Sequence, residues 1–214
     1  MEQTTQVEDV RRWLDINLPR AMNVGNDNYA TLLLLSTIDC FAQAWGNYPK
    51  NNNRDTFCSF VLKFSDLRDK LSAICPITLY YDYRDKYHFE EPRLMKSMII
   101  PYDSPVLSVI SNEYMSLIPE EEAETVRKKH QYIRLIYRLR SKLVHELRYP
   151  GTPVEFNAEK PAITMGREKG EDEKFWTLSF PKQFIFHLAE DTINNYLDQC
   201  SELPAKGIDL SWYE

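Results

Sequence analysis

The chain has few glycines and no long apolar run, and each of these shortages excludes certain classes of protein. It contains 6 Gly in 214 residues, too few for a turn-dense β-sandwich or a glycine-rich nucleotide-binding fold. The longest purely apolar run is Leu32–Leu35, which is far shorter than the stretch of about 20 residues that a membrane-spanning helix needs. We therefore expect a globular protein that does not cross a membrane.

Cysteines at metal-ligand spacing and a secretion signal are also missing. The four cysteines, Cys40, Cys58, Cys75 and Cys200, are not paired at the short intervals typical of zinc sites. The stretch Met1–Val10 is polar and acidic, unlike a signal peptide. These features predict a cytoplasmic protein with reduced thiols, no metal site and no cofactor.

A basic charge balance is missing as well. The net charge is −6 and the isoelectric point about 5.4, so no global positive field attracts nucleic acid or an anionic membrane. If RNA is a partner, it must bind a local basic patch.

What the chain does have is apolar side chains recurring at three- and four-residue steps, which predict a mainly α fold. Helices are expected over residues 7–22, 29–45, 57–74, 106–118, 119–148 and 182–201. The tyrosine-rich stretch Ile77–His88 fits a short helix or a turn region equally well, and 91–105 is expected to be a loop. Two strand candidates, 162–165 and 175–180, predict a small β-hairpin before the last helix. We expect a single domain over 1–202 and a loosely attached tail over 203–214.

Two charged side chains break the apolar pattern of their helices. Around the helix that ends near residue 148, Arg140 falls in the middle of an apolar stripe, at the step between Ile136 and Leu143. Asp39 lies in the most apolar helix, directly after Ile38. Buried charges are costly unless they are paired, so we expect these two helices to pack and Asp39 to reach Arg140 or His145.

The segment Leu139–Glu146 resembles the signature of HEPN-superfamily domains, in which an arginine precedes a histidine by four to six intervening residues. Ser141 fills the polar position that often follows the arginine, although asparagine is more usual there. Arg138 also satisfies the spacing to His145. Two further stretches, Leu32–Asp39 and Phe180–Leu197, resemble the early and closing helices of such proteins. The resemblance implies a helical bundle of the HEPN type, here with the small β-hairpin inserted before the last helix.

In catalytic members, the resemblance implies metal-independent cleavage of RNA by a dimer in which two such helices face one another. His145 would be the general acid or base, because imidazoles titrate near neutral pH. Arg140 would stabilise the charged phosphorane, and Ser141 would position a phosphate oxygen. Contacts to the RNA backbone would come from Arg138, Lys142 and Arg148.

Other interpretations stay open on sequence alone. In one interpretation, Arg140 and Asp39 form a purely structural pair. The chain would then be a non-catalytic helical module that dimerises or binds a partner protein. An antitoxin or another regulatory protein is a second expected partner of a toxin or phage-defence ribonuclease. In a weaker alternative, the tyrosine cluster binds a small molecule through Tyr80, Tyr81, Tyr83 and Tyr87.

Overall fold

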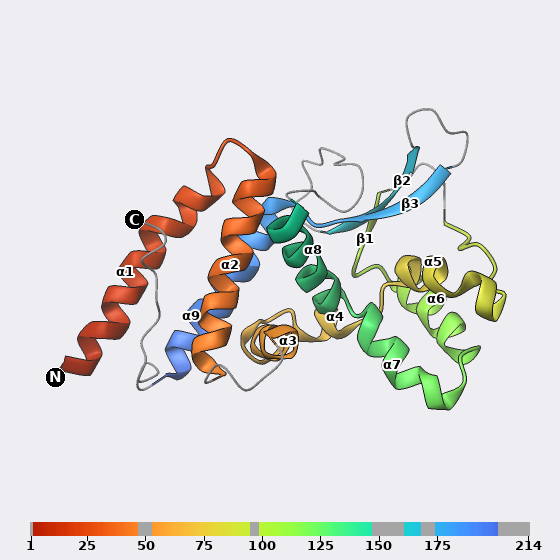
Figure 1. The fold of residues 1–214 in the computed structure, drawn as a ribbon, viewed down its shortest axis with the longest axis horizontal. Helices are drawn as coiled ribbons and strands as arrows, with labels where there is room; N and C mark the ends of the chain where they lie inside the picture. Colours follow the sequence, from red (N-terminus) through yellow and green to blue (C-terminus); the bar gives the residue numbers. More distant parts are fainter. Residues whose placement is uncertain (1, 47–52, 95–98, 147–160, 168–173, 201–214) are drawn as a thin grey trace. The chain divides into compact units, whose positions relative to one another are not determined.

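The computed structural model describes residues 2–46, 53–94, 99–146, 161–167 and 174–200, and this part of the chain is predominantly helical (Figure 1). The prediction of a mainly α fold is confirmed. The helices are α1 (Glu2–Met22), α2 (Asp27–Trp45), α3 (Asn53–Phe64), α4 (Arg68–Ser72), α5 (Pro76–Tyr87), α6 (Pro105–Ser116), α7 (Glu120–His130), α8 (Tyr132–Glu146) and α9 (Lys182–Gln199). Within these residues, no helix has the length and apolar character needed to cross a membrane.

The chain forms two compact units that alternate along the sequence. Among the described residues, unit 1 comprises 2–46, 53–68, 137–146 and 182–200, and unit 2 comprises 69–94, 99–136, 161–167 and 174–181. Each unit is therefore assembled from segments that are distant in the sequence. The single domain expected over 1–202 stays a prediction, and the expected tail over 203–214 lies outside the described residues.

Unit 1 is built around α2, which packs against α1, α3 and α9 (Figure 1). The helix begins where the Asn26 side chain accepts hydrogen bonds from the backbone N–H groups of Asn28 and Tyr29, a standard way to satisfy free amides at a helix start. Several of its apolar side chains, among them Leu34 and Ile38, are completely buried. Burial on several sides explains why this helix is the most apolar in the sequence.

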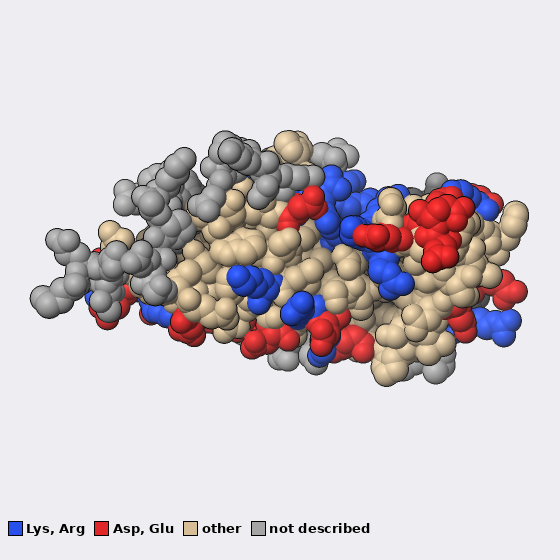
Figure 2. Space-filling model, turned by 90° about the horizontal axis from the view of Figure 1, so that it is seen from below, with Lys and Arg blue, Asp and Glu red and all other residues tan. Residues whose placement is uncertain are grey.

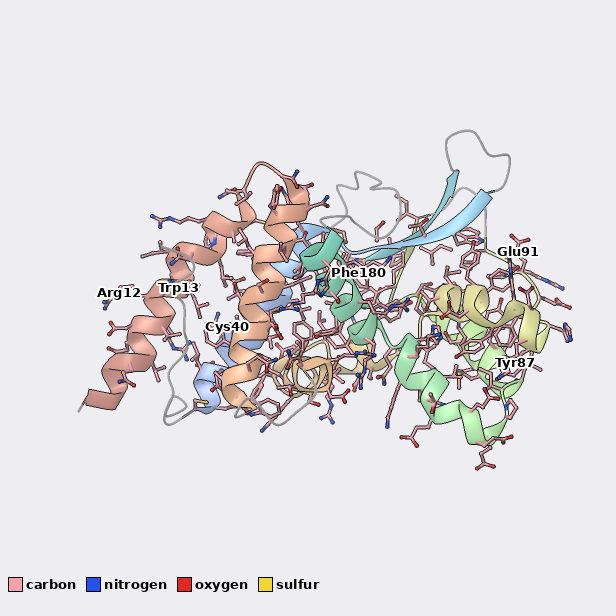
Figure 3. The ribbon with its side chains drawn as sticks, in the orientation of Figure 1. Arg12, Trp13, Cys40, Tyr87, Glu91 and Phe180 are labelled. Atoms are coloured by element: carbon pink, nitrogen blue, oxygen red, sulfur yellow. The ribbon has the colours of Figure 1, made fainter. Side chains whose placement is uncertain are left out.

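Aromatic side chains fill the space between α2, α3 and α9. The Tyr196 ring of α9 lies 6.3 Å from Phe41, 5.3 Å from Phe60 and 5.1 Å from Phe64, each in an edge-on arrangement. Figure 3 labels Trp13 on α1 and Cys40 on α2, which are half-buried in the same unit. The core of unit 1 thus joins the first and last helices of the described chain.

Unit 2 contains α5, α6 and α7 together with a small sheet. The predicted hairpin is present: β2 (Ala162–Arg167) pairs antiparallel with β3 (Lys174–Ser179). A third strand, β1 (Ile100–Pro101), pairs with the other edge of β2. The sequence placed this strand in a loop, because two residues that include a proline carry no alternation pattern.

The undecided stretch Ile77–His88 is a helix, α5. Pro76 occupies its first turn, where a missing N–H costs nothing, and His88 ends it in the left-handed conformation with a φ of 53°. Its tyrosines belong to the aromatic packing of unit 2, which includes Tyr87, labelled in Figure 3.

The expected helix over 119–148 is wrong in one respect, because the chain breaks it at Gln131. This residue has extended dihedral angles (φ −61°, ψ 141°) and forms a β-bridge with Ile74. Around the break, the Tyr132 amide donates to the Ala73 carbonyl, and the Cys75 amide donates to the His130 carbonyl. Hydrogen bonds to a distant segment therefore replace those that a continuous helix would make.

The helix expected over 57–74 also differs from the structure. It divides into α3 and α4 at Ser65, whose hydroxyl oxygen accepts a hydrogen bond from the Leu67 amide. A serine that bonds nearby backbone in this way competes with the helical ladder. The apolar spacing continues across the turn, so periodicity alone predicted one helix.

Candidate functional site on helix α8

Helix α8 carries the apolar stripe from which the site was predicted. Ile133, Ile136 and Leu143 are completely buried, as the stripe requires. Val144 belongs to the same stripe but is 41% exposed. The apolar side of α8 is therefore covered along most of the helix and open near its C-terminal end.

Arg140 lies in this stripe and is paired with Asp39 of α2. Its Nη2 donates to the Asp39 Oδ2 across 2.6 Å, and the two side chains are 21% and 11% exposed. The other carboxylate oxygen of Asp39 accepts from Gln43 Nε2 at 3.1 Å. Asp39 thus meets a cation and an amide donor, which together offset the cost of burying its charge.

Tyr137 holds Arg140 from the side of its own helix. The guanidinium carbon of Arg140 lies 6.0 Å from the centre of the Tyr137 ring, within cation–π range. The same ring packs against Phe57 of α3, with 5.4 Å between ring centres. Burial raises the pKa of the Tyr137 hydroxyl, while the positive charge of Arg140 acts in the opposite direction. Arg140 is therefore fixed by contacts to α2 and, through Tyr137, to α3.

His145 lies on a different side of the helix from Arg140. At about 100° per residue, five positions place the two side chains about 140° apart around the helix axis. His145 is exposed, and the structure does not bring it to Asp39. Of the two partners that the sequence offered to Asp39, Arg140 is the one that pairs with it.

The side of α8 that carries His145 is basic. Arg138 precedes His145 by seven residues, which places it about 20° away around the helix, and Lys142 is about 60° away from His145. Both side chains are exposed. We call Arg138, Lys142 and His145 the basic face of α8. Ser141 is half-buried on the same helix, and Arg148 lies outside the described residues.

The side chains of the basic face are of the kinds that transfer protons and bind anions. Among the described residues, no group of three or more His, Cys, Asp or Glu is arranged to hold a metal ion. The acidic net charge does not prevent local basic groups: Figure 2 shows lysine and arginine side chains lying among aspartate and glutamate side chains on one side of the molecule. The chemistry available on α8 is therefore that of an imidazole flanked by cations.

Sequence reasoning missed two residues that shape this site, Gln43 and Tyr137. Gln43 follows Asp39 by four residues on α2, so its amide lies on the same helix face, and that spacing alone could have identified it. Tyr137 precedes Arg140 by three residues on α8 and could have been found in the same way.

The tyrosines considered as a small-molecule site contact other protein groups in unit 2. Tyr80 stacks with Tyr114, Tyr83 lies beside Tyr87, and the Tyr81 hydroxyl oxygen accepts a hydrogen bond from the Trp176 amide at 2.7 Å. These rings stabilise the packing of unit 2, which is the role that aromatic side chains most often have.

Comparison with known proteins finds no matching family model, no matching curated protein and no matching solved structure. The functional argument therefore rests on the residues of α8 and on their contacts.

Proposed function

We propose that the chain is a cytoplasmic endoribonuclease whose active surface is the basic face of α8. The observation that carries the proposal is the exposed His145 on the same side of the helix as the exposed cations Arg138 and Lys142. An imidazole transfers protons near neutral pH, and neighbouring cations bind phosphate. The resemblance of Leu139–Glu146 to the HEPN signature supports metal-independent chemistry on RNA.

In the proposed reaction, the ribose 2′-hydroxyl attacks the adjacent phosphorus atom while His145 removes its proton. The bond between the 2′-oxygen and phosphorus forms, and the bond between phosphorus and the 5′-oxygen breaks. The 5′-oxygen takes a proton from the protonated imidazole of a second copy of the chain. The products are a 2′,3′-cyclic phosphate and a 5′-hydroxyl, and arginine hydrogen bonds stabilise the charge that develops on phosphorus.

The second copy makes the proposed enzyme a homodimer. Each chain contributes one His145, so the proposed site is complete only where the basic faces of two copies meet. Two basic faces together also double the local positive charge. An antitoxin or another regulatory protein that covers the basic face would switch such a ribonuclease off.

A second candidate function is a non-catalytic helical module for dimerisation or partner binding. The pairing of Arg140 with Asp39 favours it, because it gives one arginine of the motif a structural role. The exposure of His145 is required for the ribonuclease and is compatible with the module, so the cleavage assay decides between the two functions.

The test uses purified full-length protein with a labelled stem-loop RNA in the presence of EDTA. We expect cleavage products that end in a cyclic phosphate, and we expect His145→Ala to abolish them. His187→Ala, which removes another exposed histidine from α9, serves as the matched control and should cleave at the wild-type rate. Equal cleavage by wild type and His145→Ala would reject the proposal.

A further inference from the structure

The two arginines that satisfy the spacing to His145 have different environments. Arg138 is exposed, whereas the Arg140 side chain is 21% exposed and bound to Asp39. They lie about 160° apart around α8, because two positions separate them along the helix. A single RNA strand lying along the basic face therefore meets one of them and not the other.

The guanidinium group of Arg140 already interacts with other groups of the protein. Its Nη2 is bound to the Asp39 carboxylate, its guanidinium faces Tyr137, and its Nε is buried without a hydrogen-bond partner among the described atoms. The carboxylate 2.6 Å away cancels most of the positive charge that a phosphate would experience. Drawing Arg140 out to a phosphate would leave Asp39 buried without its cation, which is strongly unfavourable.

Arg138 has the opposite properties. It is exposed, it lies about 20° from His145 around the helix, and Lys142 stands one turn away, between them along the helix. Side chains on a helix lean toward its N-terminus, so the His145 ring extends over the turn that carries Lys142. These three side chains offer one imidazole and two cations to the same strand of RNA.

We infer that Arg138 is the arginine that contacts RNA phosphate, and that Arg140 is a positioning residue that fixes the rotation of α8 through Asp39. This inference rests on the proposed function, because it assigns the arginines of that same surface. It makes the effective spacing Arg-x6-His, and it gives Asp39 a role in presenting His145 to the substrate. A lysine at position 138 would keep the charge but lose the two-pronged contact that an arginine makes with a phosphate.

The experiment compares four variants for RNA cleavage, RNA binding and thermal stability. We expect Arg138→Ala to slow cleavage about 100-fold or more with an unchanged melting temperature, as for the loss of one donor to a reacting oxyanion. Arg138→Lys should restore part of the rate. Arg140→Ala should lower the melting temperature and should slow cleavage by less than Arg138→Ala does. The exchanged pair Asp39→Arg with Arg140→Asp should recover both stability and the cleavage rate. A surface control, Arg12→Ala on α1, should match wild type.

The outcomes separate this inference from the proposed function. If wild type binds RNA without cleaving it, the binding measurements test the assignment of the two arginines. Arg138→Ala should then weaken the affinity for RNA and make it depend less steeply on salt concentration. Folded Arg140→Ala protein should bind RNA as wild type does. A folded Arg140→Ala protein that loses cleavage or binding while Arg138→Ala keeps it would overturn the assignment. Equal losses with unchanged stability, or a wild type that neither binds nor cleaves, would overturn it as well.

Discussion

Arg140 and Asp39 form an ion pair across 101 positions of sequence, with 2.6 Å between the arginine Nη2 and the aspartate Oδ2. Both side chains are mostly shielded from water, and most of the other buried residues of their helices are apolar. The net stabilisation by such a pair is small. Removing one partner destabilises the protein much more, because the remaining charge is then buried without compensation.

The first prediction follows from this pair. Asp39→Asn should lower the free energy of unfolding by about 2 kcal/mol, since it leaves Arg140 without its counter-charge in a partly buried position. Urea unfolding measures the change. Asp198→Asn is the matched control, because it breaks the ion pair of Arg11 with an aspartate that is 65% exposed, where the loss should stay below about 1 kcal/mol. Equal losses in the two variants would contradict a special role for Asp39.

The second prediction concerns Gly46 at the end of α2. A Cβ at this position would lie 2.5 Å from the Thr56 Cγ2 and 3.2 Å from the Ala42 carbonyl oxygen, although the backbone φ of −78° suits any residue. Gly46→Ala should therefore destabilise the protein by about 1–3 kcal/mol through overpacking. Adding Thr56→Ser removes the clashing methyl group and should recover most of the loss. Thermal unfolding of the single and double variants checks this, and an unimproved double variant would refute the steric cause.

The third prediction concerns pH and Glu122. Its carboxylate accepts hydrogen bonds from Lys86 Nζ at 2.6 Å and from the Tyr87 hydroxyl at 2.7 Å, and these hold its pKa below the ordinary value of 4.5. A lowered pKa stabilises the fold fully above the unfolded value, and this stabilisation disappears as the pH falls through the folded value. The stability difference between wild type and Glu122→Gln should therefore be constant near neutral pH and shrink below 4.5.

Unfolding curves at a series of pH values measure this difference. High salt should reduce it, because the group is open to solvent and its interaction with Lys86 is screened. A difference that stays the same down to strongly acidic pH would show that the carboxylate contributes no charge-dependent stability.

The fourth prediction tests the aromatic core of unit 1. Phe60 is completely buried and its ring lies 5.3 Å from Tyr196 and 5.1 Å from Phe64. Phe60→Ala should cost about 3–5 kcal/mol, because the surrounding rings can close only part of the cavity. Ile16→Ala on α1, where the side chain is 46% exposed, should change stability by less than about 0.5 kcal/mol. Denaturant titration of both variants distinguishes them.

The sequence predicted the features that depend on local pattern and on the cost of buried charge. The mainly α fold follows from apolar spacing, and the pairing of Asp39 follows from the need to compensate a carboxylate in an apolar helix. The sequence did not indicate whether Asp39 pairs with Arg140 or with His145. Only the packing of α2 with its neighbours decides which side of α8 faces the aspartate.

The break at Gln131 could not be predicted from local pattern. Neither glycine nor proline interrupts the stretch between Glu120 and Glu146, and the apolar spacing runs through it. The residues on either side of it, His130 and Tyr132, form backbone hydrogen bonds with Cys75 and Ala73, which are more than fifty positions away. Such contacts leave no trace in a window of one or two helical turns.

Unit 1 is closed by contacts of α9 with α1 and α3, which are far from α9 in the sequence, and this determines when unit 1 can form during synthesis. Arg11 of α1 reaches Asn194 of α9 across 183 positions, and the Asn195 side chain donates to the Phe64 carbonyl across 131. Helix α2 leaves the ribosome long before α9, its main packing partner, has been made. Its apolar surface therefore has to be shielded in the nascent chain, and a protein truncated before α9 should aggregate where the full chain folds.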